Sequence, residues 1–280
     1  RPESKLWVGM PTWPNHIPLL GSAGFDIKQY PYYDVDARQV DTDKMMEALR
    51  QVPVGDLVLL HGCCHNPTGA DLTNEQWDSI ADLALERGFI PFIDTAYQGL
   101  GNGLDEDAYG MRMMAERLPE VIIASSCSKN FGLYRERTGS ITFIAETSEQ
   151  ADIVVSQAMS TARSIYSMPP AHGALLVSMV LGDPQLRSQW EAELEEVRLR
   201  IKSMRNLLCD SLENNAAGMD FSHIKRQNGM FSFLGITTPQ LERLRTEFGI
   251  YIVSSTRINL AGVNSNNIEY LTQSLLTVLE

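Results

Sequence analysis

The sequence predicts an α/β fold, with a mostly parallel sheet that carries helices on both faces and a smaller α+β C-terminal domain. Short apolar runs alternate with amphipathic segments along the first half, which is typical of a parallel sheet covered on both faces. After Pro169-Pro170 helical patterns dominate as far as about Asn214, and short strands return from Ile224. We therefore expect two domains, with residues 1–196 in the larger and 197–280 in the smaller.

The elements of the larger domain follow from local patterns. Thr73-Asn74-Glu75-Gln76 is a capping box that opens a helix, and Gly88 is a residue suited to end it. A second helix over 108–118 should end before Pro119. Short apolar runs predict strands at residues 6–8, 57–60, 89–93, 121–124 and 140–145.

The smaller domain mixes helices with short strands. Helices are expected from 171 to about 214, with a break at Asp183-Pro184. Further helices are predicted at 239–248 and 267–279, and strands at 230–234 and 250–253.

Composition excludes several classes of protein. The 280 residues are 44% hydrophobic with a formal net charge of −12, which suits a globular chain and disfavours a nucleic-acid surface. The four cysteines form no Cys-x-x-Cys pair, a pattern typical of reduced intracellular thiols. No apolar run approaches the length of a membrane span. We expect a cytoplasmic protein that binds neither nucleic acid nor a membrane.

Polar residues gather where three predicted strands end. Asn66 follows the first strand, Asp94 and Tyr97 the second, and Lys129 the third, with Arg137 a little later. In open α/β sheets, ligands bind beyond the carboxyl ends of the strands. A pyridoxal phosphate enzyme needs a lysine for the Schiff base, a carboxylate for the pyridinium nitrogen and an anion pocket for the phosphate. Of the six lysines, Lys129 alone lies at a predicted strand end among small polar residues.

Other chemistries fit less well. Ser126-Cys127-Ser128-Lys129 matches the Ser-x-x-Lys of acyl-serine enzymes, but no Ser-Asp-Asn accompanies it. The adjacent Cys63 and Cys64, with His61 and His65 nearby, lack a second cluster to complete a zinc tetrahedron, so no metal is expected. The glycines of 99–103 do not follow a strand as a dinucleotide fingerprint requires.

Several motifs together resemble the aspartate/aromatic aminotransferase family, and the resemblance extends over essentially all 280 residues. These motifs are Trp13-Pro14-Asn15-His16, Cys64-His65-Asn66-Pro67-Thr68-Gly69, Asp94-Thr95-Ala96-Tyr97-Gln98-Gly99, Ser126-Cys127-Ser128-Lys129-Asn130-Phe131-Gly132-Leu133-Tyr134, Glu136-Arg137, Gly229-Met230-Phe231-Ser232 and Arg257-Ile258-Asn259-Leu260-Ala261-Gly262.

The resemblance implies a role for each site residue. Lys129 would form the Schiff base with pyridoxal phosphate and then act as general base, and Asp94, supported by His16, would pair with the pyridinium nitrogen. The remaining cofactor contacts would come from Trp13 and Ala96 on the two ring faces, Asn66 and Tyr97 at the ring oxygen, and Ser126, Ser128 and Arg137 at the phosphate. The substrate would meet Arg257 at its α-carboxylate, Arg163 of a second subunit at a distal carboxylate, and Trp13, Asn66 and Phe231.

The implied reaction is ping-pong transamination between aspartate, or an aromatic amino acid, and 2-oxoglutarate, in a homodimer. Relative to the family, about the first third of the chain is missing, so the large domain should be incomplete at its N-terminus. We expect the natural protein to be longer. Two alternatives stay open at this point: an aromatic-amino-acid aminotransferase, and a truncated fragment of this fold without catalytic activity.

Overall fold

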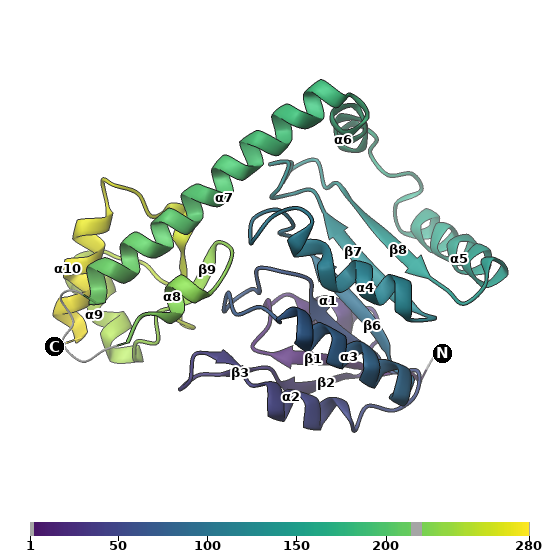
Figure 1. Cartoon of the computed structure of the whole chain (residues 1–280), viewed down its shortest axis with the longest axis horizontal. Helices are drawn as coiled ribbons and strands as arrows, with labels where there is room; N and C mark the ends of the chain where they lie inside the picture. Colours follow the sequence, from purple (N-terminus) through teal and green to yellow (C-terminus); the bar gives the residue numbers. More distant parts are fainter. Residues whose placement is uncertain (1–2, 214–219, 280) are drawn as a thin grey trace.

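The computed structural model describes residues 3–213 and 220–279. Within these residues the main sheet has six strands in the order β2-β1-β5-β6-β7-β8 (Figure 1). All neighbours pair in parallel except β7 and β8. The strands are β1 (Leu6–Met10), β2 (Ile27–Pro31), β5 (Leu57–His61), β6 (Ile90–Thr95), β7 (Val121–Ser126) and β8 (Gly139–Ile144), and a separate small ribbon joins β3 (Tyr33–Asp34) to β4 (Gln39–Val40).

Helices cover both faces of this sheet. Side chains on successive strand residues point to opposite faces, so Leu59 packs with Leu6 and Val8 in one cluster, and Val58 and Leu60 belong to another. The first cluster includes residues of α1, and the second includes residues of α2, α3 and α4. The prediction of an α/β fold with a mostly parallel sheet is therefore confirmed. These helices are α1 (His16–Ser22), α2 (Thr42–Leu49), α3 (Asn74–Arg87) and α4 (Tyr109–Arg117), the last preceded by the short η1 (Glu106–Ala108).

Three helices follow the last strand of the main sheet. After β8 come α5 (Ser148–Tyr166), α6 (His172–Gly182) and α7 (Pro184–Glu213), which is one continuous helix of 30 residues. Figure 1 shows α7 running from α6 to the C-terminal part of the chain. The predicted break at Asp183-Pro184 is confirmed as the boundary between α6 and α7, while Asn214 lies outside the described residues.

The C-terminal part has its own core. Residues of α7, α9 and α10 enclose buried side chains such as Leu208, Leu244 and Leu275. A third cluster joins the two parts, because Leu194 and Ile201 of α7 pack beside Tyr97 and Leu100. The division at residue 196 falls within α7 and stays a prediction. The elements here are α8 (His223–Arg226), β9 (Phe231–Phe233), α9 (Thr238–Phe248), β10 (Arg257–Asn259), η2 (Leu260–Gly262) and α10 (Ile268–Leu279), with β9 antiparallel to β10.

One predicted strand is wrong. Residues 250–253 form no strand, and β9 pairs instead with β10, four residues further along the chain. The Ile250 amide donates to the Leu244 carbonyl at 3.0 Å, so this segment begins as the end of α9. Tyr251 is 81% exposed, and the run lines an open groove of about 440 Å³ beside β10. β-branched residues favour a strand only where a partner strand is present.

No helix among the described residues is both long and apolar enough to cross a membrane.

Candidate active site

The predicted site residues follow the carboxyl ends of adjacent strands. In the sheet, β1, β5, β6 and β7 are consecutive neighbours, and His61 on β5 is in register with Asp94 on β6. Asp94 is in turn in register with Ala124, two residues before the end of β7. This parallel arrangement brings Asn66, Asp94, Tyr97 and Lys129 to the same edge, as the sequence predicted.

Asp94 is the first residue of a hydrogen-bonded series. Its Oδ2 lies 3.1 Å from His16 Nε2, and His16 Nδ1 lies 2.8 Å from the Thr12 hydroxyl. The same hydroxyl lies 3.1 Å from His61 Nε2. Thr12 and His16 are both buried. The expected contact between His16 and Asp94 is therefore present, and Thr12 and His61 extend it.

The pKa values of Asp94 and Lys129 are shifted in the same direction. Burial alone would raise the pKa of Asp94, but the hydrogen bond from His16 and neighbouring positive groups, Lys129 among them, lower it below its ordinary value. Burial lowers the pKa of Lys129, with Asp94 opposing this shift and Arg137 adding to it. A fixed carboxylate thus stands near an amine that gives up its proton more readily than a free lysine.

Asn66 connects a phenol to a guanidinium. Its Nδ2 donates to the Tyr97 hydroxyl at 3.3 Å, and its Oδ1 accepts from Arg257 Nη1 at 2.8 Å. Burial raises the pKa of Tyr97 to about 12, so the phenol keeps its proton at neutral pH. Lys129 Nζ lies 4.6 Å from the centre of the Tyr97 ring. Residues distant in sequence therefore meet around Lys129.

Arg257 also rests on an aromatic face. Its Cζ lies 4.2 Å from the centre of the Phe231 ring, a cation–π distance, and Phe231 meets Tyr97 edge to face at 6.1 Å. The strands β9 and β10 carry these two side chains, with Phe233 in register with Arg257. The structure therefore joins Arg257 and Phe231 to the Asn66–Tyr97 pair.

The residues predicted for an anion pocket lie between β7 and β8: Ser126 ends β7, Ser128 is in the turn that follows, and Arg137 comes shortly before β8. Ser126 Oγ accepts from the Ser128 amide at 3.1 Å, and Arg137 Nη1 donates to the Tyr134 carbonyl at 3.0 Å. Arg137 is exposed and adopts a left-handed backbone conformation with φ 51°. The positive charge of Arg137 also lowers the pKa of Lys129.

Two residues predicted to enclose a planar ring flank the same edge. Trp13 is 37% exposed, and its ring meets the His16 ring edge to face at 5.2 Å. Ala96, between Asp94 and Tyr97, packs beside the cluster that contains Tyr97.

Arg163 is set apart from these residues. It is exposed on α5, a helix with no buried residue, which follows the edge strand β8. Within the described residues, no hydrogen bond, ion pair or ring contact links it to the other site residues. Its predicted role in a neighbouring subunit's site stays a prediction.

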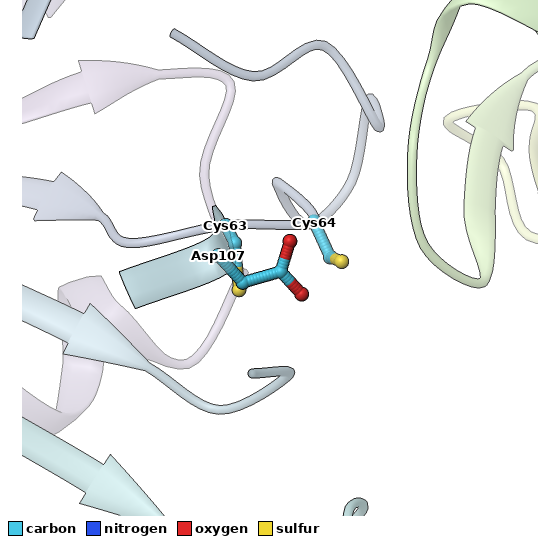
Figure 2. A group of neighbouring side chains, drawn as sticks. All are labelled: Cys63, Cys64 and Asp107. Atoms are coloured by element: carbon cyan, nitrogen blue, oxygen red, sulfur yellow. The ribbon is translucent and has the colours of Figure 1, made fainter. Parts of the chain in front are cut away.

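One cluster has metal-ligating atoms. Figure 2 shows Cys63, Cys64 and Asp107, whose ligand atoms lie within 4.8 Å of one another. The Asp107 carboxylate, however, already accepts backbone amides from Gly99, Gly101 and Asn102 at 2.8–2.9 Å. A hydrogen bond to Cys63 and burial raise the pKa of the Cys64 thiol well above its ordinary value, which disfavours the thiolate that a metal needs. We interpret the cluster as an anchor for the 99–102 loop.

The comparisons with known proteins decide the family. Residues 1–275 match the model of the family "Aminotransferase class I and II". The chain belongs to this family. It is an aminotransferase by descent, and the resemblance predicted from the sequence is confirmed. An aspartate aminotransferase from Haemophilus influenzae is 51% identical over 98% of the chain and 69% of the relative. An aromatic-amino-acid aminotransferase from Paracoccus denitrificans is 45% identical over 99% of the chain and 70% of the relative.

Solved aminotransferase structures share the fold. An aromatic-amino-acid aminotransferase from Burkholderia pseudomallei, covalently bound to pyridoxal phosphate, superposes with a TM-score of 0.98 at 42% identity. It covers the whole of this chain, which spans 70% of that structure. A mitochondrial aspartate aminotransferase from Trypanosoma brucei gives a TM-score of 0.97 at 38% identity.

Thr12 and His61 are the site residues that sequence reasoning missed. The sequence indicates His61 only as a potential metal ligand, and no motif points to Thr12. Their positions could have identified them: His61 ends β5 in register with Asp94, and Thr12 lies four residues before His16.

Proposed function

We propose that this aminotransferase uses pyridoxal phosphate at the sheet edge that carries Asp94 and Lys129. The observation that carries the proposal is a lysine with a lowered pKa in the turn just after β7, near a carboxylate that His16 holds on the neighbouring parallel strand β6. This pair supplies the two groups that the cofactor requires most directly. The family match and the pyridoxal phosphate bound to the Burkholderia pseudomallei relative support the same cofactor.

The residues around the pair fit the other parts of the cofactor. Trp13 is a partly exposed aromatic ring on the same edge, suited to stack on a pyridine ring. The Tyr97 hydroxyl and the Asn66 amide are donors for a ring oxygen. The hydroxyls of Ser126 and Ser128, with the Arg137 guanidinium, offer donors for a phosphate.

The chain's own residues would perform the proton chemistry. Bound pyridoxal phosphate supplies an electron sink for a substrate carbon that loses a proton. Asp94 stays ionised because its pKa is lowered, and it provides a fixed negative charge. The lowered pKa of Lys129 increases the fraction of neutral amine, which is the form that accepts a proton as general base. Tyr97 stays protonated and acts as a donor.

The substrate would bind through its carboxylate. Arg257 presents a guanidinium, fixed by Asn66 and the Phe231 ring, that matches an α-carboxylate with two parallel hydrogen bonds. We propose aspartate and 2-oxoglutarate as the substrate pair, because the relatives at 51% and 48% identity are named aspartate aminotransferases. Aromatic amino acids are the second candidate, since relatives at 45% and 44% identity are named for them.

A second identical subunit belongs to the proposal. Arg163 is exposed on α5, where apolar neighbours are exposed as well: Ile165 is 72% and Tyr166 53% exposed. A homodimer would cover these side chains and bring Arg163 to the neighbouring site for a distal carboxylate. A cytoplasmic location is in keeping with four cysteines that are all free thiols.

Borohydride labelling tests the proposal. The purified chain, incubated with pyridoxal phosphate and reduced with borohydride, should carry the cofactor on the peptide that contains Lys129. The matched control Lys129→Arg keeps the positive charge and should lose the label, while Lys202→Arg should keep it. Label on another lysine, or equal labelling of Lys129→Arg, would contradict the assignment.

A further inference from the structure

Arg205 is a cation without a carboxylate partner. It lies on α7, is 1% exposed, and has no ion pair within the described residues. Burial lowers its pKa to about 10, with Cys64 and Asp71 opposing the shift, so it stays charged at neutral pH. A buried charge is costly unless hydrogen bonds satisfy it. This residue therefore requires a specific set of acceptors.

Those acceptors are backbone carbonyls in the loop between α8 and β9 and in the elements at its two ends. Arg205 Nε donates to Gly229 at 2.8 Å, Nη1 to Ile224 at 2.8 Å, and Nη2 to Asn228 at 2.8 Å and also to Phe231. The planar guanidinium thus binds both sides of the loop that precedes β9. A lysine has no such fork of donors and could satisfy only part of this set.

The same loop leads to the substrate-binding residues. The Asn228 amide donates to the Gly69 carbonyl at 2.8 Å, which joins the loop to the turn that carries Asn66. The loop leaves no spare room there, because a Cβ on Gly69 would lie 2.5 Å from the Phe231 carbonyl and 2.9 Å from Arg205 Nη2. The Phe231 ring then supports the Arg257 guanidinium at 4.2 Å.

We propose that Arg205 is a positioning residue for substrate-carboxylate binding: it holds the 228–231 loop so that Phe231 supports Arg257. The inference rests on the proposed function only for the identity of the carboxylate ligand. Arg205 itself lies in the helix behind the loop and acts through the loop's carbonyls.

Arginine side-chain NMR tests the positioning without any cofactor. A guanidinium over a ring face has its Nε–H proton shifted upfield by the ring current, so Arg257 should show this shift in the unmodified chain. Phe231→Leu should abolish the shift, and Arg205→Lys should reduce it markedly, while the exposed Arg187→Gln on the same helix should leave it unchanged. Should Arg205→Lys fail to fold, Gly69→Ala places a Cβ against the Phe231 carbonyl and Arg205 Nη2 while it keeps the arginine, and it should also reduce the shift.

Calorimetric binding tests the consequence. In the chain loaded with pyridoxal phosphate, Arg205→Lys should weaken the binding of 2-oxoglutarate and of 3-phenylpropionate by the same factor, about tenfold. Both ligands place a carboxylate on Arg257. Unequal weakening, or a wild-type Arg257 shift in a folded Arg205→Lys or Gly69→Ala, would overturn the proposal. If the unmodified chain binds neither ligand, the proposed function fails, and the NMR comparison still decides the role of Arg205.

Discussion

Thr12 connects two imidazole rings through a single hydroxyl. The hydroxyl has one proton and two ring-nitrogen neighbours, His16 Nδ1 at 2.8 Å and His61 Nε2 at 3.1 Å. It must donate to one nitrogen and accept from the other, so the tautomers of the two histidines are linked. Burial, the largest cause, and the nearby His65 lower the pKa of His61 well below its ordinary value, so this ring is neutral. A change at His61 is thereby transmitted to the group that holds Asp94.

Thr12→Val should therefore destabilise the protein by about 1–3 kcal/mol, because it leaves a buried nitrogen of His16 and a partly buried nitrogen of His61 without their partner. Thr12→Ser keeps the hydroxyl and should retain most of the stability. Urea unfolding of the three proteins measures the free energies. Equal stability of the valine and serine variants would show that the hydroxyl does not bridge the rings.

The site residues differ in how far sequence could predict them. Asp94 and Lys129 were predictable because Asp94 follows one apolar run and Lys129 lies in the polar segment after the next, and the order of a parallel sheet places strand ends together. The role of Arg205 was not predictable from the sequence. Its place on the apolar stripe of α7, between Ile201 and Leu208, is unusual for an arginine, but it does not identify the acceptors. Its acceptors are carbonyls of a distant loop, and no local pattern predicts a contact of that kind.

Helix ends were well predicted where the signal is local. The capping box at Thr73 and Gln76 is present, and Gly88 ends α3 with a left-handed φ of 73°, as expected. Thr147 and Gln150 form a similar capping box at the start of α5, yet this helix was not predicted. The capping signal was present, but a capping box marks only where a helix could begin, and α5 buries none of its apolar residues, Ile153 and Met159 among them, within the described chain. The strand predicted at residues 250–253 is wrong for a different reason: its residues have a high β propensity, but they have no partner strand to pair with.

The packing of α3 against α4 depends on a glycine. A Cβ on Gly110 would lie 2.3 Å from Trp77 Cδ2, and Trp77 is buried. Gly110→Ala should destabilise the protein by about 1–3 kcal/mol through overpacking. Gly182→Ala is the control, because a Cβ there meets no atom within 4 Å. Urea unfolding should separate the two variants, and a Gly110→Ala protein as stable as Gly182→Ala would contradict this packing.

At the scale of the whole molecule, buried histidines make stability depend on pH. Burial lowers the pKa of His65 to about 3 and that of His223 to about 4, and it lowers the pKa of His61 well below its ordinary value. Below about pH 6.5 the unfolded chain binds protons at these positions that the folded chain does not. The free energy of unfolding must therefore fall as the pH is lowered through this range.

We expect His65 alone to contribute a loss of about 1.4 kcal/mol for each pH unit below about 6.5. Urea unfolding between about pH 7 and about pH 5 measures the slope. His65→Gln should reduce the slope, whereas His172→Gln, at an exposed position on α6, should not. An unchanged slope in folded His65→Gln would show that this ring is not held neutral.

The continuity of α7 has a consequence for how the molecule comes apart. At about 1.5 Å per residue the helix is about 45 Å long, and its side chains belong to the C-terminal core and to the cluster beside Tyr97. Local opening of the C-terminal core releases the Arg205 end of the helix and, with it, the support for Leu194 and Ile201. The two cores are thus joined in one cooperative unit. We expect that unfolding within α7 also disrupts the cluster beside Tyr97.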